Sequence, residues 1–575
     1  VFGCGGERDK SKRKKMGKIV NSLCNKIIVT DDNPRREKPK LIRKAIIKHI
    51  KKEKVTEIGN RISAIHSAIE KSNPKEIILV AGKGHEDIQD YGKKKYKISD
   101  IKIVKNYKIK KNKSKKEINS QHNNFLINKI TNYKSNKGFT GVSIDSKSVK
   151  KGNLFLAIKG KNNDGHNYLR EAITKGAYQC VISKNFNKIP KNRVIKVTNT
   201  YNFLKKLAVL KRNYTNGKII AVTGSSGKTS VKDLIGNLLN NYGKTYFSPR
   251  SFNNSYGVPL SLCNLEQEHE YGVFEIGMSR KGEIDNLSKL VKPNIAIITN
   301  IAEAHIENFK SLSHIAKAKG EIIDNISNSG FLIVDRDNKF FKYFKSKAEK
   351  RKIKVISIGY NKKSDIQIVK IKKFLKYKLL SIKSFNKEYK IKIHDQITKN
   401  IAFAIAVLEI LNLDVNKTKN KIKDIKVLAG RGKIYKIKYK SLNFNLIDES
   451  YNANPLSMKQ SILNLSNVKD NHQKYILLGD MLELGSKSQI LHESLSPIIN
   501  HSKINKLFVH GEHIMNTYKN VNKSKRGNIL QEKSDFKEIL LPILQNNDYL
   551  MIKGSNATGL KKISENLTKG RINVI

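Results

Sequence analysis

A strand-like run that passes through a glycine-containing loop into a helix-like run constrains the fold of this chain more than any other segment. Residues 218–222 read Lys-Ile-Ile-Ala-Val, which is typical of a buried strand. The loop Thr-Gly-Ser-Ser-Gly-Lys-Thr-Ser follows at residues 223–230, and residues 231–239 have helical periodicity. Further strand-like runs alternate with helical stretches after this segment, so we predict an α/β fold with a doubly wound, mainly parallel sheet.

The same loop predicts a nucleotide site. Backbone N–H groups of a small-residue loop, together with the N-terminus of the following helix, can hold phosphate oxygens. Lys228 can reach the outer phosphates, and the Thr229 hydroxyl suits Mg²⁺. A chance turn is the alternative, because Val222 stands where the full phosphate-loop pattern has glycine, but the flanking strand and helix favour a nucleotide site. The residues expected to bind the nucleotide are Gly224, Ser225, Ser226, Gly227, Lys228, Thr229 and Ser230.

The net charge of the chain is unusually positive. Lys and Arg number 113 against 49 Asp and Glu, which gives a formal charge of +64. Such a charge is typical of nucleic-acid-binding proteins, which stay an alternative class. However, only 16 of the basic residues are Arg, and specific recognition of phosphates and bases depends largely on Arg. We therefore expect no specific nucleic-acid partner and interpret the lysines as compositional drift.

The cysteines and the hydropathy pattern bear on the compartment. Cys4, Cys24, Cys180 and Cys263 are scattered, without a CxxC pair or a metal-type spacing, as in a reduced cytosolic protein. No apolar run approaches the ~18 residues of a membrane span, and no signal-peptide pattern opens the chain. We predict a soluble, cytoplasmic protein without membrane insertion.

Length and composition divide the chain into several domains. At roughly 100–200 residues per domain, 575 residues are too many for one compact unit. A basic stretch almost free of apolar residues predicts a linker at residues 108–124, after an α/β module at residues 1–107. We place a small domain at 125–205, the domain of the phosphate loop at 206–425 and a final α/β domain at 426–575.

Three further residues follow the phosphate loop in an order that suits nucleotide chemistry. Glu275 ends a strand-like run, where a carboxylate can ligate Mg²⁺ beside the loop. His305 follows the strand-like run 295–300, and Lys319 lies in a helix-like run. Taken singly, His305 is more simply a loop histidine and Lys319 one of 97 lysines. Their functional interpretation therefore depends on the combined pattern.

In combination, these segments resemble the Mur ligase family over nearly the whole chain after about residue 122. The most specific are Tyr-Asn-Ala-Asn-Pro at residues 451–455 and Leu-Gly-Asp-Met-Leu-Glu-Leu-Gly at residues 478–485, which are similar to the branch that adds D-alanyl-D-alanine. The other matching segments are the phosphate loop and residues 144–147, 152–160, 164–166, 253–260 and 429–432.

The resemblance implies a UDP-substrate domain, a central ATP-binding domain and a Rossmann-like C-terminal domain. It also implies a cytoplasmic, ATP- and Mg²⁺-dependent peptide ligase that joins D-Ala-D-Ala to UDP-MurNAc-tripeptide in peptidoglycan precursor synthesis. The tripeptide carboxylate would attack the γ-phosphate to form an acyl phosphate, which the dipeptide amine would then displace. A folylpolyglutamate-type or another Mur-type ligase is the alternative within this class.

The resemblance also implies catalytic and metal-binding roles. Lys228 and Thr229 would neutralise charge with Mg²⁺ during phosphoryl transfer, and Glu275 would hold that ion. His305 and Lys319, the latter as a carbamate, would hold a second Mg²⁺. The catalytic residues implied are Lys228, His305, Lys319 and Arg431.

Substrate contacts are implied on both sides of a cleft between the domains. Asn300 would approach the nucleotide, and Arg431 would reach the γ-phosphate. Tyr451 and Asn452 would meet the nucleoside from the C-terminal domain, so domain closure would assemble the site. Lys147 stands where the family usually has Arg. The residues near the uridine would be Ser143, Asp145 and Ser146.

The first module resembles the C-terminal domain of the diaminopimelate-adding branch of the same family. The matching segments are residues 1–9, 32–35 and 81–86. This module lacks the other two domains of that branch, so the chain is either a fragment of a longer fusion with such domains upstream or carries an orphan domain. The missing starting methionine and the start inside a strand-like run favour the fragment. The residues that the resemblance implies for diaminopimelate recognition are Arg8, Asn33, Arg35, Gly82 and Glu86.

Overall fold

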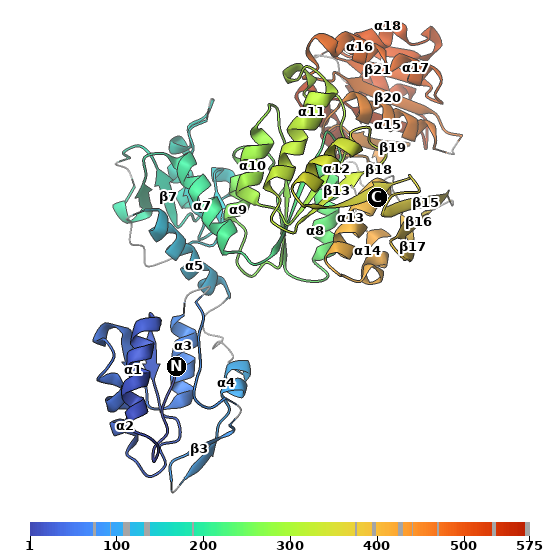
Figure 1. Cartoon of the computed structure of the whole chain (residues 1–575). Helices are drawn as coiled ribbons and strands as arrows, with labels where there is room; N and C mark the ends of the chain where they lie inside the picture. The colour runs from blue at the N-terminus through green and yellow to red at the C-terminus, as the bar shows by residue number, and fades with distance from the viewer. Residues whose placement is uncertain are drawn as a thin grey trace. The chain divides into compact units, whose positions relative to one another are not determined.

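The computed structural model describes residues 1–72, 76–84, 86–92, 94–106, 115–131, 138–160, 162–186, 189–373, 377–393, 398–423, 429–439, 441–468, 471–531 and 536–569. The chain divides into two compact units (Figure 1). The first comprises Val1–Thr140, Lys150–Leu154 and Gly176–Gln179, and the second comprises Gly141–Val149, Phe155–Lys175 and Cys180–Ile575. Every helix in the described part of the chain is too short or too polar to traverse a lipid bilayer.

The first unit is built on a short parallel sheet. Strand β1 (Ile27–Val29) pairs in parallel with β2 (Val55–Glu57), and Phe2 bridges both Val29 and Ala81. Phe2 and the apolar residues of β1 pack on Ile42 and Ile46 to form the core. The other elements are α1 (Ser11–Leu23), α2 (Pro39–Ile47), α3 (Arg61–Lys71), β3 (Ile88–Asp90), β4 (Lys95–Lys97), α4 (Asp100–Asn106) and α5 (Lys115–Ile130).

One sequence prediction in this unit is wrong. The apolar run at residues 77–81 predicts a strand, but among the described residues it makes a single isolated bridge, between Ala81 and Phe2, and the Ile77 side chain is 96% exposed. Apolar periodicity indicates a potential strand, whereas a ladder also needs backbone partners along its length. Helix α5 begins within the stretch 108–124 that we predict to be a linker, because its Lys, Glu and Gln residues are good helix formers despite their polarity; the bounds of the linker stay a prediction.

A small four-stranded sheet precedes the phosphate loop. Its strands lie in the order β5-β6-β7-β8. A long helix, α7 (Thr200–Tyr214), follows it, with the Asn199 side chain accepting a hydrogen bond from the backbone of Asn202 as the N-cap. The strands and their helix are β5 (Val142–Ser143), β6 (Leu154–Leu156), α6 (Leu169–Thr174), β7 (Gln179–Ile182) and β8 (Val194–Lys196).

The predicted doubly wound sheet is confirmed in the central domain. Six parallel strands lie in the order β10-β11-β9-β12-β13-β14. Ile220 and Val222 of β9 pack in one apolar cluster with α8 (Lys228–Leu239) and α13 (Thr398–Ile410), while α9 and α10 cover the other face (Figure 1). The remaining elements are β9 (Lys218–Thr223), β10 (Thr245–Phe247), α9 (Gly257–Cys263), β11 (Tyr271–Glu275), α10 (Glu283–Val291), β12 (Ile295–Ile298), α11 (Leu312–Lys319), β13 (Phe331–Asp335), α12 (Phe341–Lys350) and β14 (Lys354–Gly359).

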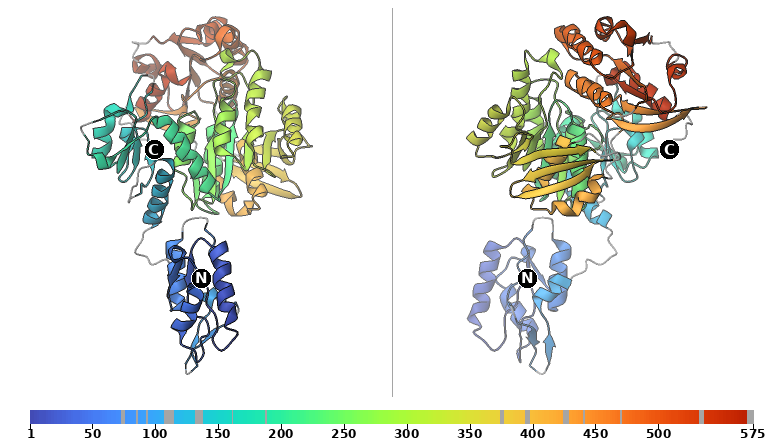
Figure 2. Two further views of the ribbon diagram at one scale, coloured as in Figure 1. Left: turned by 60° about the vertical axis from the view of Figure 1, so that its left-hand side comes forward. Right: turned by 90° about the vertical axis from the view of Figure 1, so that its right-hand side faces the viewer.

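The region at residues 341–393, which has little clear pattern in the sequence, extends this sheet. Strand β15 (Ile366–Lys373) joins β14 in parallel, and β16 (Lys378–Ser384) and β17 (Lys387–Ile393) follow it as antiparallel neighbours (Figure 2). Their outward residues are largely lysines, and in β17 the buried residues Tyr389, Ile391 and Ile393 alternate with them. This period of two marks a half-buried strand, but the abundance of lysine elsewhere in the chain obscures it.

The C-terminal domain has a second, Rossmann-like sheet, as predicted. Its strands lie in the order β18-β19-β23-β20-β21-β22, and all pairs are parallel except β18 with β19. The elements are β18 (Lys433–Tyr439), β19 (Leu442–Glu449), α15 (Pro455–Ser466), β20 (Lys474–Gly479), α16 (Ser488–Glu493), α17 (Ser496–Asn500), β21 (Lys506–His510), α18 (Met515–Asn520), β22 (Arg526–Ile529), β23 (Tyr549–Lys553) and α20 (Leu560–Lys569).

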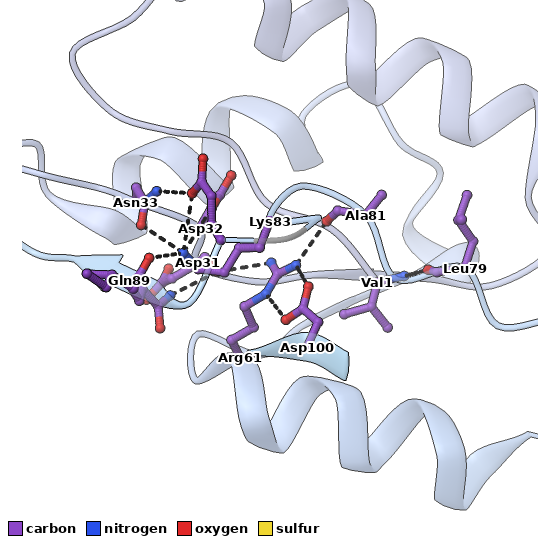
Figure 3. A network of polar contacts seen from close by, with 12 residues as sticks. Val1, Asp31, Asp32, Asn33, Arg61, Leu79, Ala81, Lys83, Gln89 and Asp100 are labelled. Carbon is purple, nitrogen blue, oxygen red and sulfur yellow. Dashed lines mark hydrogen bonds and ion pairs between the residues drawn. The ribbon is translucent and has the colours of Figure 1, made fainter. Parts of the chain in front are cut away.

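A buried ion pair joins two helices of the first unit (Figure 3). The guanidinium of Arg61, at the start of α3, donates to both carboxylate oxygens of Asp100, at the start of α4, at 2.8 and 2.6 Å. It also donates to the Ala81 carbonyl at 3.0 Å. The Arg61 side chain is fully buried and that of Asp100 is 9% exposed, so each charge depends on the other.

We expect Arg61→Met to destabilise the first unit by about 3–5 kcal/mol, because it leaves the Asp100 carboxylate buried without its cation. Hydrogen exchange in residues 61–71 and 100–106 of the full chain measures the local opening. Lys71→Met, at an exposed position of the same helix, is the control and should leave exchange unchanged. Equal exchange rates in the Arg61→Met and control variants would contradict the prediction.

Candidate active site

A cavity of about 1270 Å³ opens where the carboxyl ends of the central parallel strands face the C-terminal domain. Ligands bind at this edge of doubly wound sheets because loops and helix N-termini converge there. The cavity gathers predicted site residues from both domains, which are Ser225, Ser226, Gly227, Lys228, Thr229, Ser230, Glu275, Asn300, His305, Lys319, Arg431, Tyr451 and Asn452.

The phosphate loop is held open by its glycines and by Asn300. Gly224 has φ +147°, and a Cβ there would lie 1.9 Å from the Thr299 hydroxyl oxygen, so a side chain does not fit. The Asn300 side chain accepts from the Ser226 backbone N–H at 2.9 Å and donates to the Ser226 hydroxyl at 2.8 Å. Because α8 begins at Lys228, its first N–H groups lack partners within the helix and can hold phosphate oxygens.

Lys228 lies across this loop. Its ammonium donates to the Gly224 carbonyl at 3.0 Å. Burial lowers the pKa of Lys228, and the nearby Glu275 carboxylate opposes that shift. A cation held in a dry loop interacts strongly with a phosphate that enters it.

Thr229 and Glu275 meet at the base of the cavity. The Thr229 hydroxyl donates to one Glu275 oxygen at 2.6 Å, and the Asn253 amide donates to the other at 2.6 Å. Glu275 is 1% exposed. A hydroxyl beside a buried, oriented carboxylate fits Mg²⁺, which takes few protein ligands and completes its shell with water and phosphate oxygens. The described residues contain no group of three or more His, Cys, Asp and Glu placed to hold a metal.

The C-terminal domain contributes a cation and an aromatic ring at the same point. Arg431 donates to the Thr229 hydroxyl oxygen at 2.9 Å and to that of Ser251 at 3.3 Å. The guanidinium lies 4.3 Å from the centre of the Tyr451 ring, and the Tyr451 hydroxyl donates to Ser251 at 2.8 Å. The structure thus brings together Arg431, Tyr451 and the phosphate loop, as the resemblance implies.

His305 and Lys319 lie on the same cavity wall but in different surroundings. Lys319 is 2% exposed, and burial together with the charge of Lys228 holds its pKa well below the ordinary value. A lowered pKa raises the fraction of neutral amine, the nucleophilic form that carbamate formation requires. His305 has φ +59°, and its Nδ1 lies 2.5 Å from the carboxylate of Glu483 in the C-terminal domain. This contact lowers the pKa of Glu483.

Several cavity residues lack a clear sequence signal. Ser251 precedes the Asn253-Asn254 motif but belongs to no motif itself. At the opposite end, Lys399 pairs with Asp335 at 2.6 Å and with Asp337 at 3.1 Å. Burial raises the pKa of Asp335 although Lys399 opposes the shift. Sequence spacing places none of these pairs together, because the members come from separate strands and loops.

A buried lysine holds the Tyr451 loop to the end of β23. Lys553 has a side chain that is 2% exposed, and its ammonium donates to the Glu449 carboxylate and to the Asn452 carbonyl, both at 3.2 Å. The backbone of Asn452 thus takes part in the contact that Lys553 makes with the Tyr451 loop. The side-chain oxygen of Asn452 accepts from the Ala453 N–H at 2.9 Å.

The residues predicted near the uridine share one turn of the small domain. The Ser143 hydroxyl donates to the Asp145 carbonyl at 2.8 Å, and the Asp145 carboxylate accepts from the Lys147 N–H at 3.0 Å. The Ser146 hydroxyl donates to Glu171 at 2.8 Å. These three residues are not part of the cavity wall, and their role toward uridine stays a prediction.

The first unit has its own polar cluster, around Lys83 (Figure 3). Lys83 donates to the Asn33 side-chain oxygen at 3.0 Å and lies 3.8 Å from Asp32. Asn33 in turn donates to Glu86 at 2.9 Å, and Arg35 donates to the Gly6 carbonyl at 2.6 Å. His85 lies outside the described residues.

Arg8 and Gly82 lie near this cluster. A Cβ on Gly5 would lie 3.5 Å from an Arg35 nitrogen and 3.8 Å from Arg8 Cδ, so both arginines flank Gly5. Gly82 has φ +120°, and a Cβ there would lie 3.3 Å from an Asp32 carboxylate oxygen. The structure thus gathers the five predicted recognition residues of this module around one loop cluster.

Family models match most of the chain. The Mur ligase middle domain matches residues 222–408, and the Mur ligase family, catalytic domain matches residues 138–212. The Mur ligase, glutamate ligase domain matches twice, at residues 1–84 and 436–556. The first unit is therefore similar to a Mur ligase C-terminal domain, like the last domain of the chain.

Individual relatives are similar over nearly their full length. The UDP-N-acetylmuramoyl-tripeptide–D-alanyl-D-alanine ligase of Rickettsia prowazekii is 34% identical over 426 residues, which are 73% of this chain and 94% of that protein. The Bacillus subtilis ligase of the same name is 29% identical over 74% of this chain and 93% of its own. The structure of Thermotoga maritima MurF ligase in complex with ADP has a TM-score of 0.62 at 26% identity, over 75% and 98% of the two chains.

Crystal structure I of MurF from Acinetobacter baumannii has a TM-score of 0.67 at 25% identity, and it covers 76% of this chain and 94% of that one. The phosphate loop, the buried carboxylate and the arginine from the facing domain form a nucleotide site, and the family models and curated relatives identify the chain as an ATP-dependent ligase. The chain belongs to the Mur ligase family, and its curated relatives there are the UDP-N-acetylmuramoyl-tripeptide–D-alanyl-D-alanine ligases.

We expect Lys553→Met to lower kcat/KM for ATP by roughly tenfold or more, because hydrogen bonds to charged groups contribute about 1.5–3 kcal/mol and this one holds the Tyr451 loop. Initial rates at varied ATP measure the effect. Lys562→Met, at an exposed position of α20, is the control. An unchanged kcat/KM in a folded Lys553→Met sample would contradict a role for the anchor.

Proposed function

We propose that this chain joins D-alanyl-D-alanine to UDP-N-acetylmuramoyl-tripeptide with the consumption of ATP. The observation that carries the proposal is the meeting of Glu275, Arg431 and the phosphate loop at the Thr229 hydroxyl. The names of the relatives, which the chain matches over more than nine-tenths of their length, supply the substrates. Because the proposed reaction consumes ATP, we place it in the cytoplasm.

The chemistry begins with an unreactive carboxylate. The terminal carboxylate of the tripeptide attacks the γ-phosphorus of ATP, ADP leaves, and an acyl phosphate forms. The neutral amine of the dipeptide then adds to the acyl carbon, and phosphate leaves as the amide forms. Each step builds or moves negative charge, so fixed cations around the phosphoryl group favour it.

The residues of the cavity divide this task. Lys228 and Arg431 approach the phosphate loop from different domains and can neutralise the transferred group. Thr229 and Glu275 would hold Mg²⁺, which supplies further neutralisation when bound. Lys319, as a carbamate, and His305 would hold a second ion. Burial and the charge of Lys228 lower the pKa of Lys319, and this shift favours that modification.

The test is a coupled assay with UDP-MurNAc-tripeptide, D-Ala-D-Ala, ATP and Mg²⁺ that follows phosphate and product mass. We expect phosphate release that depends on the dipeptide, with one product of the summed mass less water. Free L-glutamate replaces the dipeptide in a parallel reaction. Phosphate release with glutamate and none with D-Ala-D-Ala would assign the chain to a folylpolyglutamate-type activity instead.

We expect Lys319→Ala to lower kcat by roughly 10²–10³-fold, as the loss of one electrostatic group at a reaction centre does, while nucleotide binding persists. Added acetate or formate should restore part of the rate by replacing the carbamate. Lys317→Ala, exposed on the same helix, is the control. Full activity in Lys319→Ala would exclude the carbamate role.

The first unit carries a second proposed function, recognition of a diaminopimelate-type amino acid. Arg8 and Arg35 supply cations for a carboxylate, and Glu86, held by the Asn33 amide, supplies a carboxylate for a distal ammonium. Their support is the convergence of these side chains around Lys83 and Gly5. Whether ATP-binding domains of the same branch lie upstream stays a prediction.

We expect Arg35→Ala to weaken diaminopimelate binding by roughly 10–100-fold, since hydrogen bonds to charged groups contribute about 1.5–3 kcal/mol, and to leave D-Ala-D-Ala ligation unchanged. Calorimetric titration of the full chain measures the binding. Arg36→Ala, at the next and more exposed position, is the matched control. A large loss of ligation in Arg35→Ala would show that the two functions are coupled.

A further inference from the structure

The loop Leu482-Glu483-Leu484-Gly485 of the C-terminal domain lies against the His305 segment of the central domain. Glu483 Oε2 is 2.5 Å from His305 Nδ1. The Glu307 N–H donates to the Glu483 carbonyl at 3.2 Å. A Cβ on Gly485 would lie 2.9 Å from Glu307 Cβ, so the two backbones pack without room for a side chain. Side-chain, backbone and packing contacts therefore coincide at one place.

The backbone at this contact is specified on both sides. His305 has φ +59° and Glu483 has φ +64°, in the left-handed region that residues other than glycine rarely occupy. Such conformations persist only where the surrounding structure determines them, and they cluster at functional sites. His305 and Glu483 come from different domains, contact each other and both have left-handed backbones. We infer that this contact forms in one defined geometry.

The Glu483 loop is fixed to its own domain. The Leu482 N–H donates to the Ser555 hydroxyl at 3.0 Å, and the preceding Met481 N–H donates to His492 Nε2 at 3.0 Å. The Leu484 side chain is 2% exposed. The Glu483 carboxylate therefore moves with the body of the C-terminal domain, and it reaches His305 only when that domain is docked.

A carboxylate at Nδ1 has a defined chemical effect on an imidazole. Glu483 and His305 are in ion-pair contact that does not meet hydrogen-bond geometry. The negative charge beside Nδ1 favours the tautomer with the proton on that atom, which leaves Nε2 as the electron-pair donor. His305 lines the cavity beside Lys319 and the phosphate loop. The arrangement prepares the ring to bind a cation or a polar group in the cavity.

We propose that Glu483 is a positioning residue that orients His305 for Mg²⁺ and so couples docking of the C-terminal domain to assembly of the metal site. The part of this proposal that concerns Mg²⁺ rests on the proposed ligase function. The contact between the two domains is independent of that function. A ligase that builds its metal site only on docking avoids spending ATP while the C-terminal domain is displaced.

Glu483→Gln tests this coupling, because the amide keeps the size of the side chain and removes its charge. We expect the Mg²⁺ concentration for half-maximal ligation to rise by about tenfold or more, as loss of a group that orients a metal ligand does. The KM for ATP measured at saturating Mg²⁺ should stay unchanged. Glu512→Gln, exposed in the same domain, is the control and should change neither value.

A second measurement does not depend on activity. Hydrogen exchange in residues 301–309 of the ligand-free full chain should be faster in Glu483→Gln than in the control, while exchange in residues 474–479 stays equal. Glu483→Asp, which keeps the charge on a shorter side chain, should lie between the two. Unchanged Mg²⁺ dependence together with unchanged exchange at 301–309 would overturn the proposal. Faster exchange in a chain without dipeptide-dependent ligation would support the contact and reject the ligase assignment.

Discussion

The hydroxyl of Thr229 is the point on which the organisation of the site depends. It donates to the buried carboxylate of Glu275 and accepts from Arg431, which lies 202 residues further along the chain. A buried carboxylate is unfavourable unless cations and donors surround it. Here Asn253, the phosphate loop and a side chain from another domain supply them. The same requirement that stabilises Glu275 therefore holds the two domains at the geometry in which a nucleotide can be bound between them.

Residues 1–84 and 436–556 both match the Mur ligase, glutamate ligase domain. In both domains a buried lysine holds a loop, but the two loops present different groups. In each, a lysine that is 2% exposed contacts an acid near the end of a strand. Lys83, two residues after the bridge at Ala81, lies near Asp32, and Lys553, the last residue of β23, contacts Glu449 at the end of β19. In both cases the lysine also holds the loop after that acid, through Asn33 in one and Asn452 in the other. One loop presents recognition residues for an amino acid in our proposal, and the other presents Tyr451 to the phosphate loop.

The charge of +64 separates into two populations of lysine. Most lysines are exposed and alternate with buried apolar residues, as in β17, where they serve only as polar surface. A few are buried and specifically paired, such as Lys211 with Glu266 at 3.1 Å and Lys232 with the carbonyls of Ser248 and Arg250. Composition alone does not distinguish these groups, because the difference between them is burial and not residue type.

The sequence by itself determined the phosphate loop, the strands that lead into it and the order of the motifs, because strand, loop and helix are local patterns read from adjacent residues. It misjudged residues 77–81, where an apolar run lacks the backbone partners that a strand needs. Only the tertiary structure placed Ser251 beside Tyr451, Lys553 beneath Asn452 and Glu483 against His305. Those pairs are separated by 100 residues or more, and the packing of whole domains decides which distant side chains meet.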